Sequence, residues 1–353
     1  MRPFKFLFLF FAVINLILGM ISGLGRLGII MPLPEIYIHH GAIMVGGFLG
    51  SLIALEKVIP LRRKIYFVGP LLSAGSLPVF MAGSFQVAVW MLILASINFI
   101  MVYAAYLKKQ FSLYLALAMI GSGCWLIGNV LLLWKRFYPM VFPWWMGFLL
   151  FTIISERLEL SRFLPVSKAQ KNWLYLFLAL FVIGLLIPFH GAGTVVTGFA
   201  LIFMSVWLMR YDVIRITLKK EGLARYTAVA LLTGYVALLL NGLFIIALKE
   251  ATYAYDIVVH TFFLGFVFAM IFAHGPIILP GVLGLTVKPY HPLFYLPLVS
   301  LMTSLLIRIA ADASIIPIVY RALSGWISMG SIILYFLFMI IFTLRSVGFK
   351  KSS

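Results

Sequence analysis

Cysteine, acidic residues and charge in general are scarce in this sequence. The single cysteine, Cys124, excludes an internal disulfide framework, a cysteine-based zinc site and an iron–sulfur cluster. Only 10% of the 353 residues are charged, whereas a soluble domain has roughly 25%. No GxGxxG fingerprint, Walker motif or Ser-His-Asp arrangement is present in the sequence.

Long apolar runs are what the sequence has in abundance. Hydrophobic residues make up 64% of the chain and the mean hydropathy is +1.14, so we expect the apolar surface to be buried in lipid. Only helices and closed barrels span lipid, and these runs lack the alternation of strands. The sequence therefore predicts an all-α polytopic membrane bundle of about twelve transmembrane helices, forming one domain over residues 1–353. The predicted spans are 4–24, 36–56, 65–82, 86–107, 111–134, 139–155, 172–190, 193–210, 226–248, 256–275, 292–310 and 315–344.

The first span resembles a signal peptide, because Arg2 and Lys5 precede its apolar run. It lacks a convincing small-residue cleavage site and further spans follow, so we expect it to be retained.

The excess of basic residues, 27 Lys and Arg against 9 Asp and Glu, would indicate nucleic acid binding in a soluble chain. Here the basic residues concentrate in alternate loops: with both termini inside, 21 of the 27 lie on the inner side. This positive-inside bias predicts the orientation and explains the charge by contact with an anionic leaflet, without nucleic acid. We expect a multi-pass protein of a cell membrane, either a bacterial inner membrane or an archaeal plasma membrane.

Histidines at membrane depth are the main functional candidates, because an ionisable side chain inside a span is costly. Four of the six are predicted near the outer side, and they are His39, His40, His190 and His260. His274 is predicted about 21 Å deeper than His260. These five histidines are the candidate metal ligands.

The spacing of His260 and His274 indicates a redox role. In a regular helix, 14 residues end about 40° short of four full turns, so both rings project from one face. The same spacing is seen in helices of b-type cytochromes that hold two haems, which is a resemblance. Two haems would need a second helix with histidines 14 residues apart, but the residue 14 positions after His40 is Ala54. The sequence therefore supports at most one haem b with two histidine ligands, on the outer side. Its ligands would be His260 and either His39 or His40.

The rings of His39 and His40 diverge by about 100°, so one can face iron while the other meets a second metal or a hydrogen-bond partner. Gly46 and Gly50 continue the face of His39. They predict a flat slot for a porphyrin; the alternative is close packing of small residues against another helix.

Three polar positions are predicted to support this site. Asp256 lies one turn before His260 and is placed to accept a hydrogen bond from its ring N–H, although an acidic residue also suits a helix N-terminus. Arg308 and Asp312 predict an i,i+4 salt bridge, or a pair that holds cofactor propionates or an outer polar pocket. Midspan Asn241 is expected to hydrogen-bond to a neighbouring helix.

Two segments carry a family resemblance. The segment from His40 to Phe48 (HGAIMVGGF) and the segment from His260 to His274 (HTFFLGFVFAMIFAH) resemble the His-bearing spans of NnrS-type proteins, or of a related haem membrane family. The resemblance implies a membrane protein of about twelve spans that contains haem and copper and takes part in the nitric oxide response.

We therefore expect an integral membrane haem-binding protein, with or without copper, whose redox or gas-binding centre lies near the outer face. Its expected partners are the lipid bilayer and a redox partner or a gas such as nitric oxide. Electron transfer, gas binding and catalytic turnover remain open, because no proton-delivering chain of carboxylates is readable along the spans. Two other classes are a His-lined transporter or channel for protons, metal ions or a small anion, and a structural or assembly factor.

Overall fold

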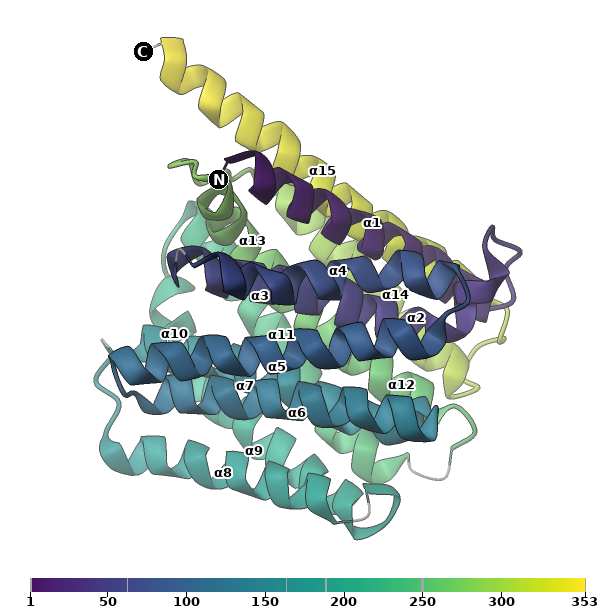
Figure 1. The fold of residues 1–353 in the computed structure, drawn as a ribbon. Helices are drawn as coiled ribbons and strands as arrows, with labels where there is room; N and C mark the ends of the chain where they lie inside the picture. Colours follow the sequence, from purple (N-terminus) through teal and green to yellow (C-terminus); the bar gives the residue numbers. More distant parts are fainter. Residues whose placement is uncertain (1, 62, 163, 188, 249–250, 353) are drawn as a thin grey trace. The chain divides into compact units, whose positions relative to one another are not determined.

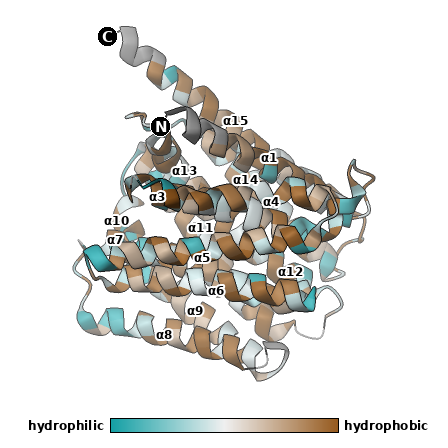
Figure 2. Cartoon of the chain, in the orientation of Figure 1, coloured by the Kyte–Doolittle hydropathy of each residue, from teal (hydrophilic) through white to brown (hydrophobic). Residues whose placement is uncertain are grey.

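A computed structural model describes residues 2–61, 63–162, 164–187, 189–248 and 251–352, and these residues form helices and loops without strands. Twelve of the described helices are long and apolar enough to cross a membrane, which confirms the all-α polytopic bundle predicted from the sequence. The protein is an integral membrane protein. Apolar residues cover the middle of its helices, and hydrophilic residues gather towards the helix ends and in the loops (Figure 2).

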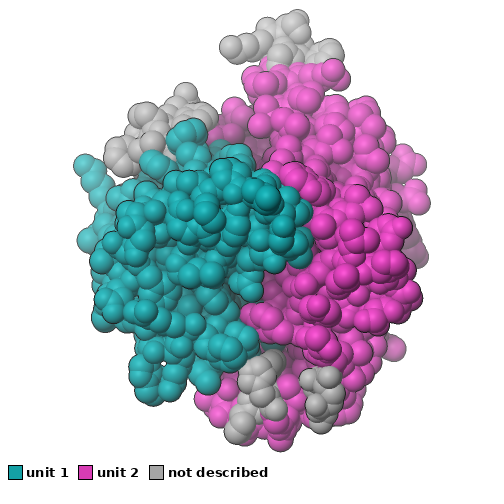
Figure 3. All heavy atoms as spheres, turned by 90° about the vertical axis from the view of Figure 1, so that its right-hand side faces the viewer, with its two compact units in different colours: residues 1–159 teal, residues 160–353 magenta. Residues whose placement is uncertain are grey.

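The chain divides into two compact units, residues 1–159 and 160–353, which Figure 3 colours separately. The single domain expected over residues 1–353 stays a prediction.

Unit 1 contains the first six spans (Figure 1). Within it, α1 packs against η2 and α4, α4 against α5, and α5 against α6, where α denotes α-helix and η a 3-10 or π-helix. Neighbours in sequence are thus neighbours in space, as short connections favour. Its elements are α1 (Arg2–Arg26), η1 (Pro34–His39), α2 (His40–Ala42), η2 (Ile43–Gly50), α3 (Ser51–Val58), η3 (Ile59–Leu61), η4 (Lys64–Phe67), α4 (Val68–Met81), α5 (Phe85–Lys109), α6 (Leu113–Lys135) and α7 (Tyr138–Ser161).

Unit 2 contains the other six spans. Helix α9 packs against α8 and α11, α11 against η6 and α13, and α14 against α15. Its elements are α8 (Lys168–Leu186), η5 (Phe189–Gly193), α9 (Thr194–Tyr211), α10 (Ile214–Thr217), α11 (Gly222–Ala247), α12 (Ala254–His260), η6 (Thr261–Val267), α13 (Phe268–Leu283), η7 (Pro292–Phe294), α14 (Tyr295–Asp312) and α15 (Tyr320–Ser352).

Several helices differ in extent from the predicted apolar runs. The run 139–155 was bounded by charge, whereas α7 continues to Ser161 through Glu156 and Arg157. A charged residue ends an apolar run but not a helix, because its backbone N–H and C=O can stay in the helical hydrogen-bond ladder. Conversely, α15 begins only at Tyr320, after a turn in which the Tyr320 N–H bonds to the Pro317 carbonyl.

Candidate functional site

Both spans that carry the resemblance change from α- to π-helix just after their histidines. In unit 1, α2 begins at His40 and leads into the π-helix η2; in unit 2, α12 ends at His260 and leads directly into the π-helix η6. A π turn bonds each N–H to the carbonyl five residues earlier, and such turns are frequent at functional sites.

Side chains of neighbouring helices donate to carbonyls in or next to these π turns. The Ser73 hydroxyl donates to the Gly46 carbonyl at 2.6 Å. The Asn241 amide donates to the Val258 carbonyl at 2.6 Å, which confirms the expected helix-to-helix hydrogen bond of this residue. These hydrogen bonds satisfy backbone carbonyls that cannot bond to water inside a membrane.

The π segment changes the predicted alignment of His260 with His274. A π turn accommodates roughly one extra residue, so it rotates all later residues by about 100° relative to a regular α-helix. The seven residues of η6 lie between the two histidines. Instead of ending about 40° apart, the two positions end about 140° apart. The common stripe predicted for these two rings is therefore wrong, because the prediction assumed one uninterrupted helical period.

His39 and His40 face different helices, as their spacing predicted. The His39 ring stacks on Phe80 of α4 and on Phe85, with centroid distances of 4.8 and 5.3 Å. Its Nδ1 lies 3.4 Å from the Tyr138 hydroxyl. The His40 ring lies against α1 instead, where its Nδ1 is 2.7 Å from the Gly19 carbonyl oxygen.

The glycine stripe of span 2 is filled by packing. A Cβ added to Gly46 would lie 2.7 Å from the Leu92 side chain, and one added to Gly50 would lie 2.4 Å from the Trp125 ring. Both glycines are buried. Side chains of α5 and α6 therefore occupy the space beside Gly46 and Gly50. This supports the close-packing alternative over the predicted porphyrin slot.

Asp256 orients the His260 ring. The His260 Nδ1 lies 3.0 Å from the Asp256 backbone oxygen and 3.3 Å from its carboxylate Oδ1, so the contact expected one turn apart is present. The side chains of both residues are 18% exposed, which leaves this pair partly accessible. The Asp256 oxygens fix the imidazole through Nδ1. In a metal-ligating histidine, the ring nitrogen that does not bind the metal commonly makes a hydrogen bond of this kind.

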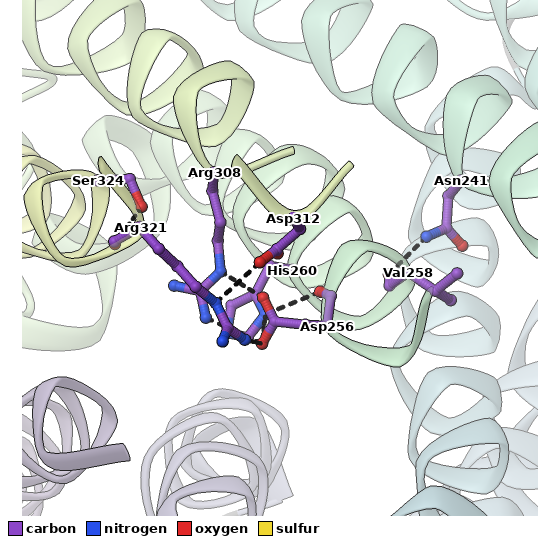
Figure 4. Close-up of polar contacts among 8 residues, drawn as sticks. All are labelled: Asn241, Asp256, Val258, His260, Arg308, Asp312, Arg321 and Ser324. Carbon is purple, nitrogen blue, oxygen red and sulfur yellow. Dashed lines mark hydrogen bonds and ion pairs between the residues drawn. The ribbon is translucent and has the colours of Figure 1, made fainter. Parts of the chain in front are cut away.

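Two arginines from other helices hold Asp256 in turn (Figure 4). Arg308 of α14 donates two hydrogen bonds, from Nε to Oδ2 at 2.6 Å and from Nη2 to Oδ1 at 2.9 Å. Arg321 of α15 lies 3.0 Å from Asp256 Oδ1 and pairs with Asp312 at 2.8 Å. The i,i+4 salt bridge predicted between Arg308 and Asp312 is thus replaced by pairings between helices.

Arg321 was missed from the sequence. Its position could have indicated the pairing, because Arg321 stands near the start of the last span, nine residues after Asp312 and across a short turn. The i,i+4 rule assigned Arg308 to Asp312 and no arginine to Asp256, whereas both Arg308 and Arg321 lie beside Asp256 in the structure.

Three of the candidate histidines have the same ring hydrogen bond. Nδ1 faces a backbone carbonyl oxygen in each: Gly19 for His40, Asp256 for His260 and, at 2.6 Å, Met270 for His274. A carbonyl oxygen only accepts, so Nδ1 carries a proton, and in the neutral ring the lone pair lies on Nε2. This is the tautomer of a histidine that binds a metal through Nε2.

His291 has the opposite arrangement. Its Nδ1 accepts a hydrogen bond from the Leu293 N–H at 3.2 Å, and its ring stacks on Phe342. The ring proton of a neutral His291 therefore sits on Nε2. This histidine, which the sequence did not select, provides an internal reference for the other three.

The histidines are distributed over both units. His39 and His40 belong to unit 1, and His260 and His274 belong to unit 2. The side chain of His190 lies outside the described residues. Among the described side chains, no three or more His, Cys, Asp and Glu residues form a group that could hold a metal ion. A haem ligated by spans 2 and 10 together stays a prediction.

The chain belongs to the family described as "Domain of unknown function (DUF8744)", which matches residues 5–344. No curated protein and no solved structure matches the chain.

Proposed function

We propose that this protein binds haem b in the membrane and that His260 is an axial ligand to the iron through Nε2. The single observation that carries the proposal is the hydrogen bonding of His260: Nδ1 is committed to Asp256, and the lone pair lies on Nε2. Haem, when bound, supplies one-electron redox chemistry or an iron position for a gas such as nitric oxide. The proposed place is a cell membrane with both termini inside, where positive-inside charge puts His260 near the outer face.

The surrounding residues have defined tasks in this proposal. Asp256 orients the imidazole, and the two hydrogen bonds from Arg308 restrict the rotation of its carboxylate. Phe262 and Phe266 follow His260 in η6 and are fully buried, so the helix turns after the ring carry apolar side chains. Ligand, orienting group and apolar surroundings are the parts by which a protein tunes a haem.

The nitric oxide response and a second, copper-containing centre belong to the same proposal. Their support is the resemblance of the two histidine spans to NnrS-type proteins, together with the hydrogen bonds of His40 and His274, whose Nδ1 faces a backbone carbonyl oxygen. Neutral imidazole suits copper as well as iron. Electron transfer to a redox partner and gas binding both fit a single ligated haem.

The experiment is haem loading of purified protein, with His260→Ala as the variant. We expect a Soret band in the wild type and haem per chain lower by roughly tenfold or more in the variant. His291→Ala is the matched control, because His291 has the opposite tautomer, and it should load haem normally. A wild type without a Soret band, or a His260→Ala variant that keeps its haem, would overturn the proposal.

A second candidate function is transport of protons, metal ions or a small anion. The observation that favours it is charge inside the spans of both units: the Asp256 cluster in unit 2, and Lys57 in unit 1, whose ammonium lies 2.9 Å from Glu56 and 2.7 Å from Glu156. Charges within spans often mark ion pathways. Ion flux into proteoliposomes by protein that lacks a chromophore would establish transport; a chromophore without flux would exclude it.

A further inference from the structure

Two carboxylates from different helices meet one ammonium group in unit 1. Lys57 Nζ lies 2.9 Å from Glu56 Oε1 and 2.7 Å from Glu156 Oε1. Glu56 and Lys57 belong to α3, whereas Glu156 belongs to α7. The exposed fractions of these three side chains lie between 21% and 28%, so the cluster is partly accessible. A positive group thus already lies between two anionic side chains within the spans.

Two further groups add to the polar surroundings of this cluster. A third carboxylate, Glu159 of α7, interacts electrostatically with Glu56. The Tyr106 hydroxyl of α5 donates to the Lys57 backbone carbonyl at 2.8 Å, so its hydrogen is already used. Three helices, α3, α5 and α7, therefore contribute polar side chains to one place in unit 1.

A buried hydroxyl without a partner also belongs to this place. Tyr103 of α5 is only 2% exposed, and its hydroxyl has no hydrogen-bond partner among the described residues. Its ring packs edge-on against Phe99, with centroids 4.9 Å apart. The hydroxyl interacts electrostatically with Lys57 and with the two carboxylates that hold it. Because buried polar groups normally have a partner, this hydroxyl indicates a ligand at the cluster.

We propose that Glu56, Glu156 and Tyr103 form a binding site for a small monovalent cation such as Na⁺, which takes the place of the Lys57 ammonium. Carboxylate and hydroxyl oxygens are hard ligands and suit hard cations. The resident ammonium carries one positive charge, so a monovalent ion in its place keeps the charge between the carboxylates unchanged. Lys57 is partly exposed on a flexible stem, so its ammonium can move to more polar surroundings and stay charged.

The site names an ion class for the second candidate function, transport, and it needs neither haem nor His260. It contains two acidic residues and a hydroxyl. It therefore differs from the groups of three or more His, Cys, Asp and Glu that are absent among the described side chains. Binding in detergent tests the site, whereas flux into proteoliposomes tests transport, so either result can fail without the other.

The experiment measures equilibrium binding of radioactive Na⁺ to the purified full-length protein in detergent, with choline chloride keeping the ionic strength constant. We expect saturable binding in the wild type. Tyr103→Phe should lower the affinity by roughly threefold to tenfold, because it removes only the hydroxyl and keeps the ring. Tyr226→Phe is the matched control and should bind as the wild type does. Tyr226 of α11 is also fully buried with a hydroxyl that lacks a partner among the described residues, but this hydroxyl interacts electrostatically with tyrosines and not with carboxylates.

A second variant tests the place of the ion. Lys57→Met removes the competing ammonium and keeps an unbranched side chain. The affinity for Na⁺ should rise by roughly tenfold or more, because no part of the population is then occupied by the resident cation. Na⁺ should also raise the melting temperature of Lys57→Met more than that of the wild type.

Each other result overturns the site. Absence of saturable Na⁺ binding, equal affinity in Tyr103→Phe, or unchanged affinity in Lys57→Met would leave the cluster as a structural ion pair. Equal losses in Tyr103→Phe and Tyr226→Phe would assign the change to packing. Haem is quantified on the same samples: Na⁺ binding by protein without haem would remove the haem proposal and leave this site standing.

Discussion

Replacement of Asp256 by Asn tests the charge network that orients His260. The substitution keeps the size of the side chain but removes the charge that two arginines share, one of them through two hydrogen bonds of 2.6 and 2.9 Å. The Arg308 side chain is only 8% exposed, so water cannot replace the lost partner. Removing one partner of a buried ion pair costs roughly 3–5 kcal/mol. Because Asp256 is 18% exposed, we expect the lower end, about 3 kcal/mol.

The assay is thermal unfolding in detergent, where this loss corresponds to a fall in melting temperature on the order of 5 °C. Glu221→Gln, at an exposed position of the same unit, is the control and should change the stability by less than about 0.5 kcal/mol. Arg308→Met should also destabilise, and the double variant should be more stable than the sum of the two losses predicts, by about 1–3 kcal/mol. Strictly additive losses would refute direct coupling between Asp256 and Arg308.

Two predictions concern the packing around the π-helices. Gly50→Ala should destabilise unit 1 by about 1–3 kcal/mol, because the new Cβ would lie 2.4 Å from the fully buried Trp125 ring. Gly123→Ala is the control and should be neutral or stabilising, because nothing lies within 4 Å of its Cβ position. Equal melting temperatures for the two variants would contradict the packing. Asn241→Leu should cost about 0.6–1.7 kcal/mol by leaving the Val258 carbonyl without its 2.6 Å donor, and unchanged thermal stability would show that this bond contributes nothing.

The spans were predictable because hydropathy decides them. A run of about 20 apolar residues has few alternatives to a transmembrane helix, and all twelve predicted runs have a counterpart among the described helices. Helix ends were less predictable, as α7 shows by continuing past Glu156 to Ser161. Apolarity reports where a span meets the interface, whereas backbone hydrogen bonding decides where the helix stops.

The phase of the residues along a span was not predictable from periodicity. Rotation by 100° per residue aligned His260 with His274, but η6 interrupts that period. The Asn241 amide of α11 bonds to the Val258 carbonyl just before this segment, and a contact between helices of this kind is not readable from the local sequence. The local part of the prediction, Asp256 beside the His260 ring, needed only one turn and is present.

Partners across helices were also beyond the sequence. Arg308 and Asp312 satisfy the i,i+4 rule, yet Arg308 binds Asp256, and Arg321 takes Asp312. A bidentate pairing with a carboxylate on another helix is stronger than an i,i+4 pair, and only the packing of α14 against α12 and α15 provides it.

The most direct measurement of the central claim is the low-temperature electron paramagnetic resonance spectrum of the oxidised, purified protein, recorded beside its optical spectrum. We predict a ferric haem signal with nitrogen ligation that is present in the wild type and His291→Ala and lost in His260→Ala. A wild-type protein without a ferric haem signal, or an identical signal in His260→Ala, would contradict ligation of iron by this histidine.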